Sequence, residues 1–290
     1  MRLAFSLALL LALALPGHAS GKKKKVDISV VITAESSPWV EPSTVLAASR
    51  PLFEMLARRA RLTYSMQAFT SEASALDLFL SGKTNAGNTS LPLYMKLSEQ
   101  VEIVPLCRPV KFGRPTFRLL LLVRAGSQIE GISGLRGKAI SIDSEQTSRI
   151  YLTVLARRSG IKDTRAFFRS IQAKRNPRSA VLDVLMGEAD ACIVSDVILR
   201  TMAELNPKLA RRVVQVHASE PFAYNPVFVR KDLPARKRAA LKKVSLELHD
   251  HTVGKQVLTI FRIDRMVAAR PDYESFRKVW REYARLKEGK

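Results

Sequence analysis

The sequence predicts an α/β protein with two lobes, each a mostly parallel sheet flanked by helices. Short apolar, β-branched segments alternate with segments of helical periodicity, which is typical of parallel sheets covered on both faces. This pattern occurs twice, once before Leu119 and once after Gly134. Two further segments, an apolar run near Leu120 and residues 221–229, are expected to be the hinge crossings between the lobes.

Residues 1–19 have the features of a secretory signal peptide. Arg2 provides a charged start, residues 3–15 are largely apolar, and small residues precede a cleavage position near Ala19. An apolar helix of that length spans about 20 Å, which is short of the roughly 30 Å of membrane hydrocarbon. We therefore expect an exported mature chain that begins with a basic leader at 20–25.

The elements of the first lobe follow in order. Residues 26–34 are β-branched and largely apolar, which predicts a buried strand. A helix is predicted at 43–60, with Pro51 marking its true start after an irregular lead-in, because proline is favoured at the first helical position. The alternation of apolar and polar residues in 62–69 predicts a second strand.

A second helix is predicted at 73–81 and ends at Gly82, because glycine readily adopts the conformation that closes a helix. A short strand and loop follow at 85–90, then a third helix from about Pro92. The inward face of the second helix is expected to hold Leu76, Phe79 and Leu80.

The second lobe is entered through the longest apolar β-like run, 117–123. A strand at 139–142, a polar loop and a helix at 149–159 that ends at Gly160 come next. Alternation then predicts strands and helices in turn, with strands at 167–171, 189–194, 212–216 and 225–230 and helices at 179–186 and 198–205. From Pro234 onward the chain is predicted to be helical, with breaks at Gly254 and 269–271.

The start of the helix after 139–142 is a candidate anion site. A helix start leaves about four backbone N–H groups unpaired and carries roughly half a positive charge. The hydroxyls of Thr147 and Ser148 either cap this helix or contact a bound oxyanion. Residues 187–196 predict a turn and a strand of the same sheet, ending in a second polar loop. Two such strands form a ligand crevice in open α/β sheets.

The chain is strongly basic, with 48 Lys and Arg against 26 Asp and Glu and a net charge of +22 spread along its length. Spread charge is typical of a solvated basic surface, which steers small anions or rests on anionic lipid. No aromatic and basic residues interleave as in single-strand-binding proteins, and we expect no nucleic-acid partner. Of the two cysteines, Cys192 is expected to be a small buried hydrophobe, and a bridge to Cys107 stays open.

Several segments together resemble the periplasmic substrate-binding proteins of phosphate/phosphonate-type ABC transporters, across nearly all of the mature chain. They are the opening strand and loop at 33–39, an L-x-G-K-like turn at 135–138, a hydroxyl-rich loop at 143–148, a G-x-A-D turn at 187–190, a return crossing at 207–226 and an Asp/Tyr element at 269–273. The resemblance implies the two-lobed periplasmic-binding-protein fold. Lobe I is then predicted at 26–121 and 224–290, and lobe II at 122–223.

The resemblance also implies a set of ligand contacts in the loops that face the crevice. For Glu72, Arg149 and Asp196 a structural role is the alternative: a charge at a helix start, a basic helix face and a helix cap. Two positions depart from the family pattern, because Arg149 stands where Gly is frequent and Asn85 where an acidic residue is usual. The full set is Ser36, Ser37, Glu72, Thr89, Ser90, Gln146, Thr147, Ser148, Arg149, Ser195, Asp196 and Asn225.

The function implied is that of a soluble periplasmic component of an ABC importer. It would capture a small oxyanion (phosphate, phosphonate or related) by hinge closure, as a monomer, and deliver it to a permease in the inner membrane. We expect no cofactor, metal or catalysis: His249 and His251 fall in a predicted helix, where they point apart. The alternatives are a ligand-sensing protein that docks on a membrane sensor and a secreted hydrolase that depends on His217.

Overall fold

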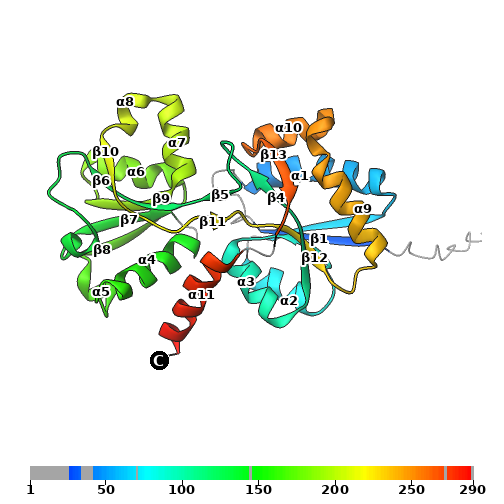
Figure 1. The fold of residues 1–290 in the computed structure, drawn as a ribbon, viewed down its shortest axis with the longest axis horizontal. Helices are drawn as coiled ribbons and strands as arrows, with labels where there is room; N and C mark the ends of the chain where they lie inside the picture. Colours follow the sequence, from blue (N-terminus) through cyan, green and yellow to red (C-terminus); the bar gives the residue numbers. More distant parts are fainter. Residues whose placement is uncertain (1–25, 34–41, 70, 144–145, 271–272, 289–290) are drawn as a thin grey trace, which may run out of the picture.

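The computed structural model describes residues 26–33, 42–69, 71–143, 146–270 and 273–288. The predicted signal peptide, the basic leader, Ser36 and Ser37 lie outside these residues. Two sheets form two lobes that lie side by side (Figure 1). Among the described residues no helix is both long and apolar enough to cross a bilayer.

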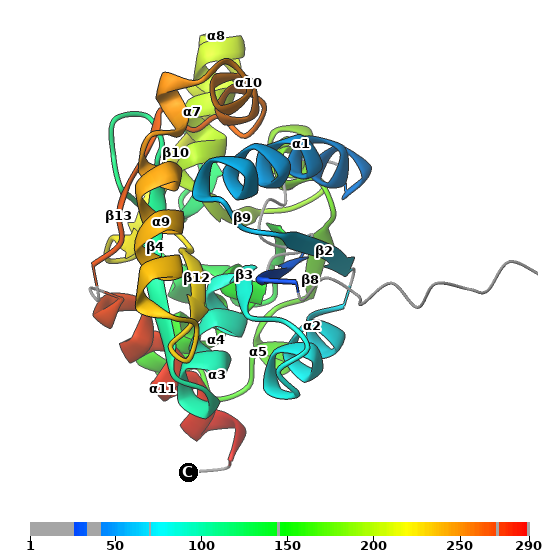
Figure 2. The same cartoon turned by 90° about the vertical axis from the view of Figure 1, so that its right-hand side faces the viewer.

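The first lobe contains a six-stranded sheet in the order β13-β4-β12-β3-β1-β2. Its strands are β1 (Ile28–Thr33), β2 (Tyr64–Phe69), β3 (Ala86–Asn88), β4 (Ile103–Val110), β12 (Val227–Arg230) and β13 (Arg265–Ala268). Its helices are α1 (Pro42–Ala60), α2 (Glu72–Leu80), α3 (Leu91–Gln100), α9 (Ala235–Leu246) and α10 (Thr252–Ile260). Figure 2 shows α1 and α10 on one face of this sheet and α2 and α3 on the other.

The second lobe contains a five-stranded sheet in the order β10-β6-β9-β7-β8. Its strands are β6 (Leu119–Arg124), β7 (Ala139–Asp143), β8 (Ser170–Lys174), β9 (Ala191–Ser195) and β10 (Val213–Ala218). Its helices are α4 (Gln146–Arg158), α5 (Thr164–Phe167), α6 (Pro177–Met186), α7 (Asp196–Leu205) and α8 (Pro207–Ala210).

The two lobes are joined by a short pair of antiparallel strands, β5 (Thr116–Phe117) and β11 (Phe222–Ala223). These are the two crossings that the apolar runs near 120 and at 221–229 predict. The predicted lobe limits fall within β6 and at the end of β11, and they stay a prediction.

The sheets are mixed rather than mostly parallel, and the crossings explain why. In the second sheet β7 pairs in parallel with β8 and β9, whereas β6 is antiparallel to β9 and β10. In the first sheet β1 pairs in parallel with β2 and β3, whereas β12 is antiparallel to β3 and β4 and β13 to β4. Because β6 and β12 are the first strands after each crossing, they start at the edge where β9 and β3, their antiparallel neighbours, end.

Several local expectations are wrong. The helix α1 runs through Pro51, which lies on an exposed part of the helix together with Ala47, the residue whose carbonyl loses its helical partner. Leu80 is 38% exposed, since it is the last residue of α2. Phe167 lies in α5 and not in a strand. The region after Pro234 is interrupted by β13.

Gly254 lies inside α10 instead of breaking a helix. A Cβ atom there would lie 2.0 Å from the carbonyl oxygen of Leu248, so only glycine lets α10 pack against the preceding turn. That turn is a short 3-10 helix, η3 (Leu248–Asp250), and His251 is the residue before α10, without a capping hydrogen bond from its side chain. The two histidines are therefore not in one α-helix, and no group of three or more His, Cys, Asp or Glu that could hold a metal ion occurs in the described ranges.

The two cysteines are free and fully buried in different lobes, Cys107 in β4 and Cys192 in β9. The bridge that the sequence leaves open is thus not formed. Burial raises the pKa of the Cys107 thiol to about 12, and it raises the pKa of the Cys192 thiol as well.

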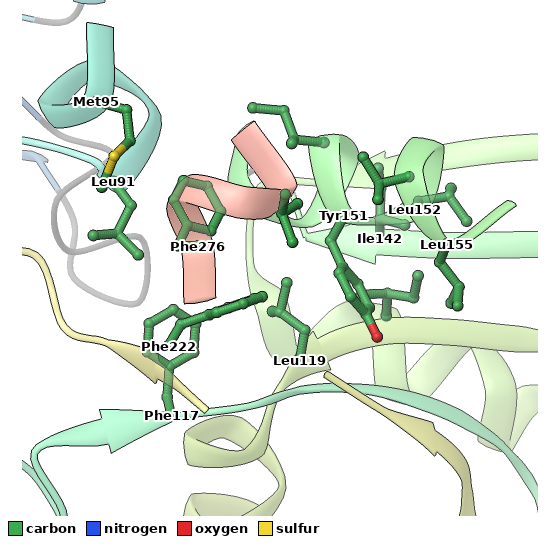
Figure 3. Close-up of a cluster of buried hydrophobic side chains, with 14 of the residues drawn as sticks. Leu91, Met95, Phe117, Leu119, Ile142, Tyr151, Leu152, Leu155, Phe222 and Phe276 are labelled. Carbon is green, nitrogen blue, oxygen red and sulfur yellow. The ribbon is translucent and has the colours of Figure 1, made fainter. Parts of the chain in front are cut away.

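The last helix, α11 (Glu274–Lys287), connects the two lobes. Trp280 Nε1 donates to Glu99 Oε1 of α3 at 2.7 Å, and Arg158 of α4 pairs with Glu282 at 2.9 Å. Phe276 is fully buried, with its ring 5.3 Å from that of Phe222 in an edge-to-face arrangement. Figure 3 shows Phe276 between Leu91 and Met95 of α3 and the residues around Phe222, Leu119 and Tyr151. The hydrophobic core is thus continuous from one lobe to the other.

We predict that Phe276→Ala lowers the free energy of unfolding by about 3–5 kcal/mol, because it leaves a cavity where the lobes share their core. Urea denaturation of the mature chain measures this. Arg285→Ala, which changes an exposed residue of the same helix, is the control and is expected to stay within about 0.5 kcal/mol. Equal effects of the two substitutions would contradict the role given to Phe276.

Asp27 joins the first strand to α9 and generates a dependence of stability on pH. Its carboxylate accepts a hydrogen bond from Lys237 Nζ at 2.6 Å and from the backbone N–H and the hydroxyl of Thr63 at 2.8 and 2.9 Å. The Lys237 bond is the main cause that lowers the pKa of Asp27 to about 2 from 3.8. Because the folded pKa lies below the unfolded one, this stabilisation is present above pH 3.8 and is lost as the pH falls through 2.

We predict that Asp27→Asn lowers the free energy of unfolding by about 1–2 kcal/mol at pH 7, and that this difference shrinks between pH 4 and pH 2. Urea titrations at pH 7, 4 and 2.5 test it. Asp77→Asn removes an exposed carboxylate of α2 and serves as the control. A difference that is independent of pH would refute this account of Asp27.

Candidate functional site

The direction of the crossing strands determines where the polar loops lie. β6 and β12 each begin at the sheet edge where the chain enters the lobe. β9 is antiparallel to β6, and β3 is antiparallel to β12, so β9 and β3 end at that same edge. The carboxyl ends of β1 and β3 in the first lobe, and of β7 and β9 in the second, therefore face the opposite lobe. The loops that follow these strands carry most of the predicted ligand contacts, so the topology brings those contacts to the two facing edges.

On the first-lobe edge, Thr89 and Ser90 lie between β3 and α3, and both are almost fully buried. Ser90 caps α3: its Oγ accepts a hydrogen bond from the N–H of Leu93 at 3.3 Å. The same hydroxyl donates to Glu72 Oε1 at the start of α2. Glu72 and Ser90 are therefore brought together, and the carboxylate is held in place by the hydroxyl.

On the second-lobe edge, α4 starts three residues after β7 ends. Thr147 and Ser148 are fully buried in its first turn, whereas Gln146 and Arg149 are exposed. The Ser148 hydroxyl makes no hydrogen bond within the part of the chain that the structure describes. A buried hydroxyl without a partner costs free energy. Together with the unpaired N–H groups of a helix start, it forms a set of donors suited to an oxyanion.

Ser195 is the last residue of β9, the strand next to β7 in the sheet, and Asp196 is the first residue of α7. Ser195 is 6% exposed and its side chain makes no capping hydrogen bond to α7. Asp196 has partners within the protein: its Oδ1 accepts from the N–H of Arg118 at 3.1 Å, and its Oδ2 lies 3.5 Å from Arg200. These contacts attach the start of β6 to α7, which favours the structural alternative for Asp196.

The last predicted contact, Asn225, is half-buried just before β12. It lines a cavity of the first lobe together with Asn88 and Lys111. The amide of Asn88 donates to the carbonyl of Pro226 at 3.1 Å and so connects β3 to the return crossing. Asn85, the departure from the family pattern, lies at the opposite end of β3 and bonds to β1, away from this edge.

Tyr151 is a candidate residue that the sequence interpretation missed. Its ring stacks on His217 with centroids 6.4 Å apart, and its hydroxyl has no hydrogen-bond partner among the described residues. Burial raises the pKa of Tyr151 to about 12, so the group stays a neutral donor near pH 7. Tyr151 lies four residues after Thr147, and this helical spacing is the signal that places both on one face of α4.

Lys111 and Tyr224 were also missed, and no sequence pattern marks them. Lys111 is 4% exposed, and its ammonium lies 5.7 Å from the centroid of the Tyr224 ring. Burial raises the pKa of Tyr224. A cation and a neutral phenol are thus buried beside Asn225, where the return crossing enters the first lobe.

Comparison with known proteins gives one family. The sequence model described as ABC transporter, phosphonate, periplasmic substrate-binding protein matches residues 36–273. A search of curated protein sequences finds no significant match.

Solved structures agree with the fold. A chloride-bound protein of Xanthomonas citri, XAC2383, has a TM-score of 0.74 at 16% identity over 91% of this chain and 99% of its own. PhnD1 from Prochlorococcus marinus, solved with methylphosphonate, has a TM-score of 0.68 at 16% identity, over 89% of this chain and 98% of its own. The binding protein component of an ABC phosphonate transporter from Pseudomonas aeruginosa has a TM-score of 0.67 at 13% identity, over 90% of this chain and 87% of its own. The predicted two-lobed α/β fold is confirmed.

Proposed function

The chain belongs to the family of periplasmic substrate-binding proteins of phosphonate ABC transporters, and we propose that it captures a small oxyanion between its lobes. In this proposal the ligand is a phosphonate or a related anion, and it is bound without being altered. The protein acts as a monomer and delivers the anion to a permease in the inner membrane. Residues 1–19 direct export and are removed in the mature protein.

The observation that carries the proposal is the buried, unpartnered hydroxyl of Ser148 in the first turn of α4, among the residues that the structure describes. An oxyanion at this helix start would accept from that hydroxyl and from backbone N–H groups at once. On the facing edge of the other lobe, the Ser90 hydroxyl donates to Glu72 and the Thr89 hydroxyl to the carbonyl of Ser90, so a ligand there would have to displace these hydrogen bonds. The ligand is then held by both lobes only when they close.

The energetics fit a transport protein. A micromolar dissociation constant needs about −8 kcal/mol. Each hydrogen bond to a charged group contributes roughly 1.5–3 kcal/mol, so several of them with exclusion of water are sufficient. A ligand that contacts both lobes shifts the population toward the closed shape, because it binds that shape better. The permease can then distinguish loaded from empty protein.

We predict that methylphosphonate raises the melting temperature of the mature chain. At a concentration one hundred times the dissociation constant, the added stability is about 2.7 kcal/mol. For a protein of this size that corresponds to roughly 5–10 °C. A thermal-shift panel of methylphosphonate, phosphite, phosphate and methanesulfonate measures it. If none of these anions stabilises the protein, the proposed function is wrong.

We predict that Ser148→Ala weakens anion binding roughly ten- to hundredfold, measured by calorimetry, because it removes one hydrogen bond to a charged group. The free energy of unfolding without ligand should not fall, since the hydroxyl has no partner to lose within the described chain.

The matched control is Thr84→Val. Thr84 also has a fully buried hydroxyl with no partner in the described ranges, but it precedes β3 and so lies at the edge away from the second lobe. Its removal should leave the binding constant unchanged. Equal losses of binding in the two variants would argue against a ligand at α4.

A further inference from the structure

An apolar cavity of about 120 Å³ lies in the first lobe, between the first sheet and the helices α1, α9 and α10. Its walls include Leu56, Val257, Leu258, Phe261 and Met266. Native cores contain few voids larger than a water molecule, and an unfilled void lowers stability. An engineered apolar cavity of 150 Å³ binds benzene, so this one has room for a ligand group of about six carbons.

The cavity borders the edge that faces the second lobe. Asn88 ends β3, Asn225 lies just before β12, and both line the cavity. Thr89, on the proposed anion site, is the next residue after Asn88. Ile32, near the end of β1, also lines it. The cavity is also lined by Val257 and Leu258 of α10.

The lining has the composition expected for an uncharged group. No acidic residue is among its described lining residues, and the hydroxyls of Ser49 and Ser245 belong to residues that are only 4% exposed. The polar lining groups at its sheet edge are the amides of Asn88 and Asn225 and the ammonium of Lys111. An elongated molecule with an anionic head and an apolar tail matches this distribution of polar and apolar surface.

We propose that the cavity receives the apolar substituent of the bound anion, so that the preferred ligands are phosphonates with an alkyl or aryl group of up to about six carbons. This inference rests on the proposed function and specifies its substrate class. Bare phosphate and methylphosphonate fill the anion site only and leave the cavity empty.

Calorimetry with methyl-, propyl-, pentyl- and octylphosphonate on the mature chain tests the inference. Transfer of a methylene group into an apolar site predicts a dissociation constant roughly fourfold lower for each added methylene. The gain is expected to continue to about pentyl and to stop before octyl, because the cavity is then full. Pentan-1-ol, which lacks the anionic head, is expected to bind far more weakly than pentylphosphonate.

Two substitutions on α10 change the volume of the cavity in opposite directions. Val257→Phe fills it and should remove the gain from methyl to pentyl while leaving the affinity for methylphosphonate unchanged. Leu258→Ala enlarges it and should move the optimum to a longer chain, which keeps the test informative if Val257→Phe does not fold. Thr259→Leu, at an exposed position of the same helix, is the control and should reproduce the wild-type series.

The outcomes separate the two proposals. If methylphosphonate binds but chain length has no effect, this inference fails and the proposed function stands. If no phosphonate of any length binds, both fail. A chain-length series that is unchanged in Val257→Phe and Leu258→Ala, or pentan-1-ol binding as tightly as pentylphosphonate, would also overturn the assignment of the cavity to the ligand's tail.

Discussion

A strand that enters a sheet from another lobe must start at the edge nearest that lobe, and the arrangement of the candidate site depends on this constraint. β6 and β12 obey it, and their antiparallel pairing with β9 and β3 makes the βα units end at the same edges. Helix starts and polar loops consequently face each other across the crossings. The reversed strands that make the sheets mixed are thus also what orients the proposed anion site.

The second constraint is that the lobes share one hydrophobic core. α11 places Phe276 between α3 and the residues around the crossings, as Figure 3 shows, while its polar links to Glu99 and Arg158 lie nearer the surface. Exposed pairs contribute little to stability, whereas the buried ring contributes several kcal/mol. Motion between the lobes therefore has to keep Phe276 buried, which favours rotation about the end of the molecule where α11 lies.

Much of the fold could be predicted because alternation and helical periodicity are local signals. The strand β4 was not predicted, since Pro105 and Pro109 argue against a central strand. A register shift in its pairing with β12 lies next to Pro105. The predicted helix break at Gly254 was wrong because this glycine is needed for the close contact of α10 with Leu248, which the sequence does not reveal. The hydroxyls at α4 were visible as a pattern, whereas the cavity draws its walls from elements far apart in the sequence and no local signal marks it.

The placement of the thiols has a consequence for export. Cys107 and Cys192 are fully buried, and burial suppresses the thiolate, which is the form that oxidants and other thiols attack. Once folded, the protein can remain in an oxidising compartment with both sulfurs reduced. The unfolded chain has no such protection, so burial of the two thiols on folding is what shields them from disulfide formation.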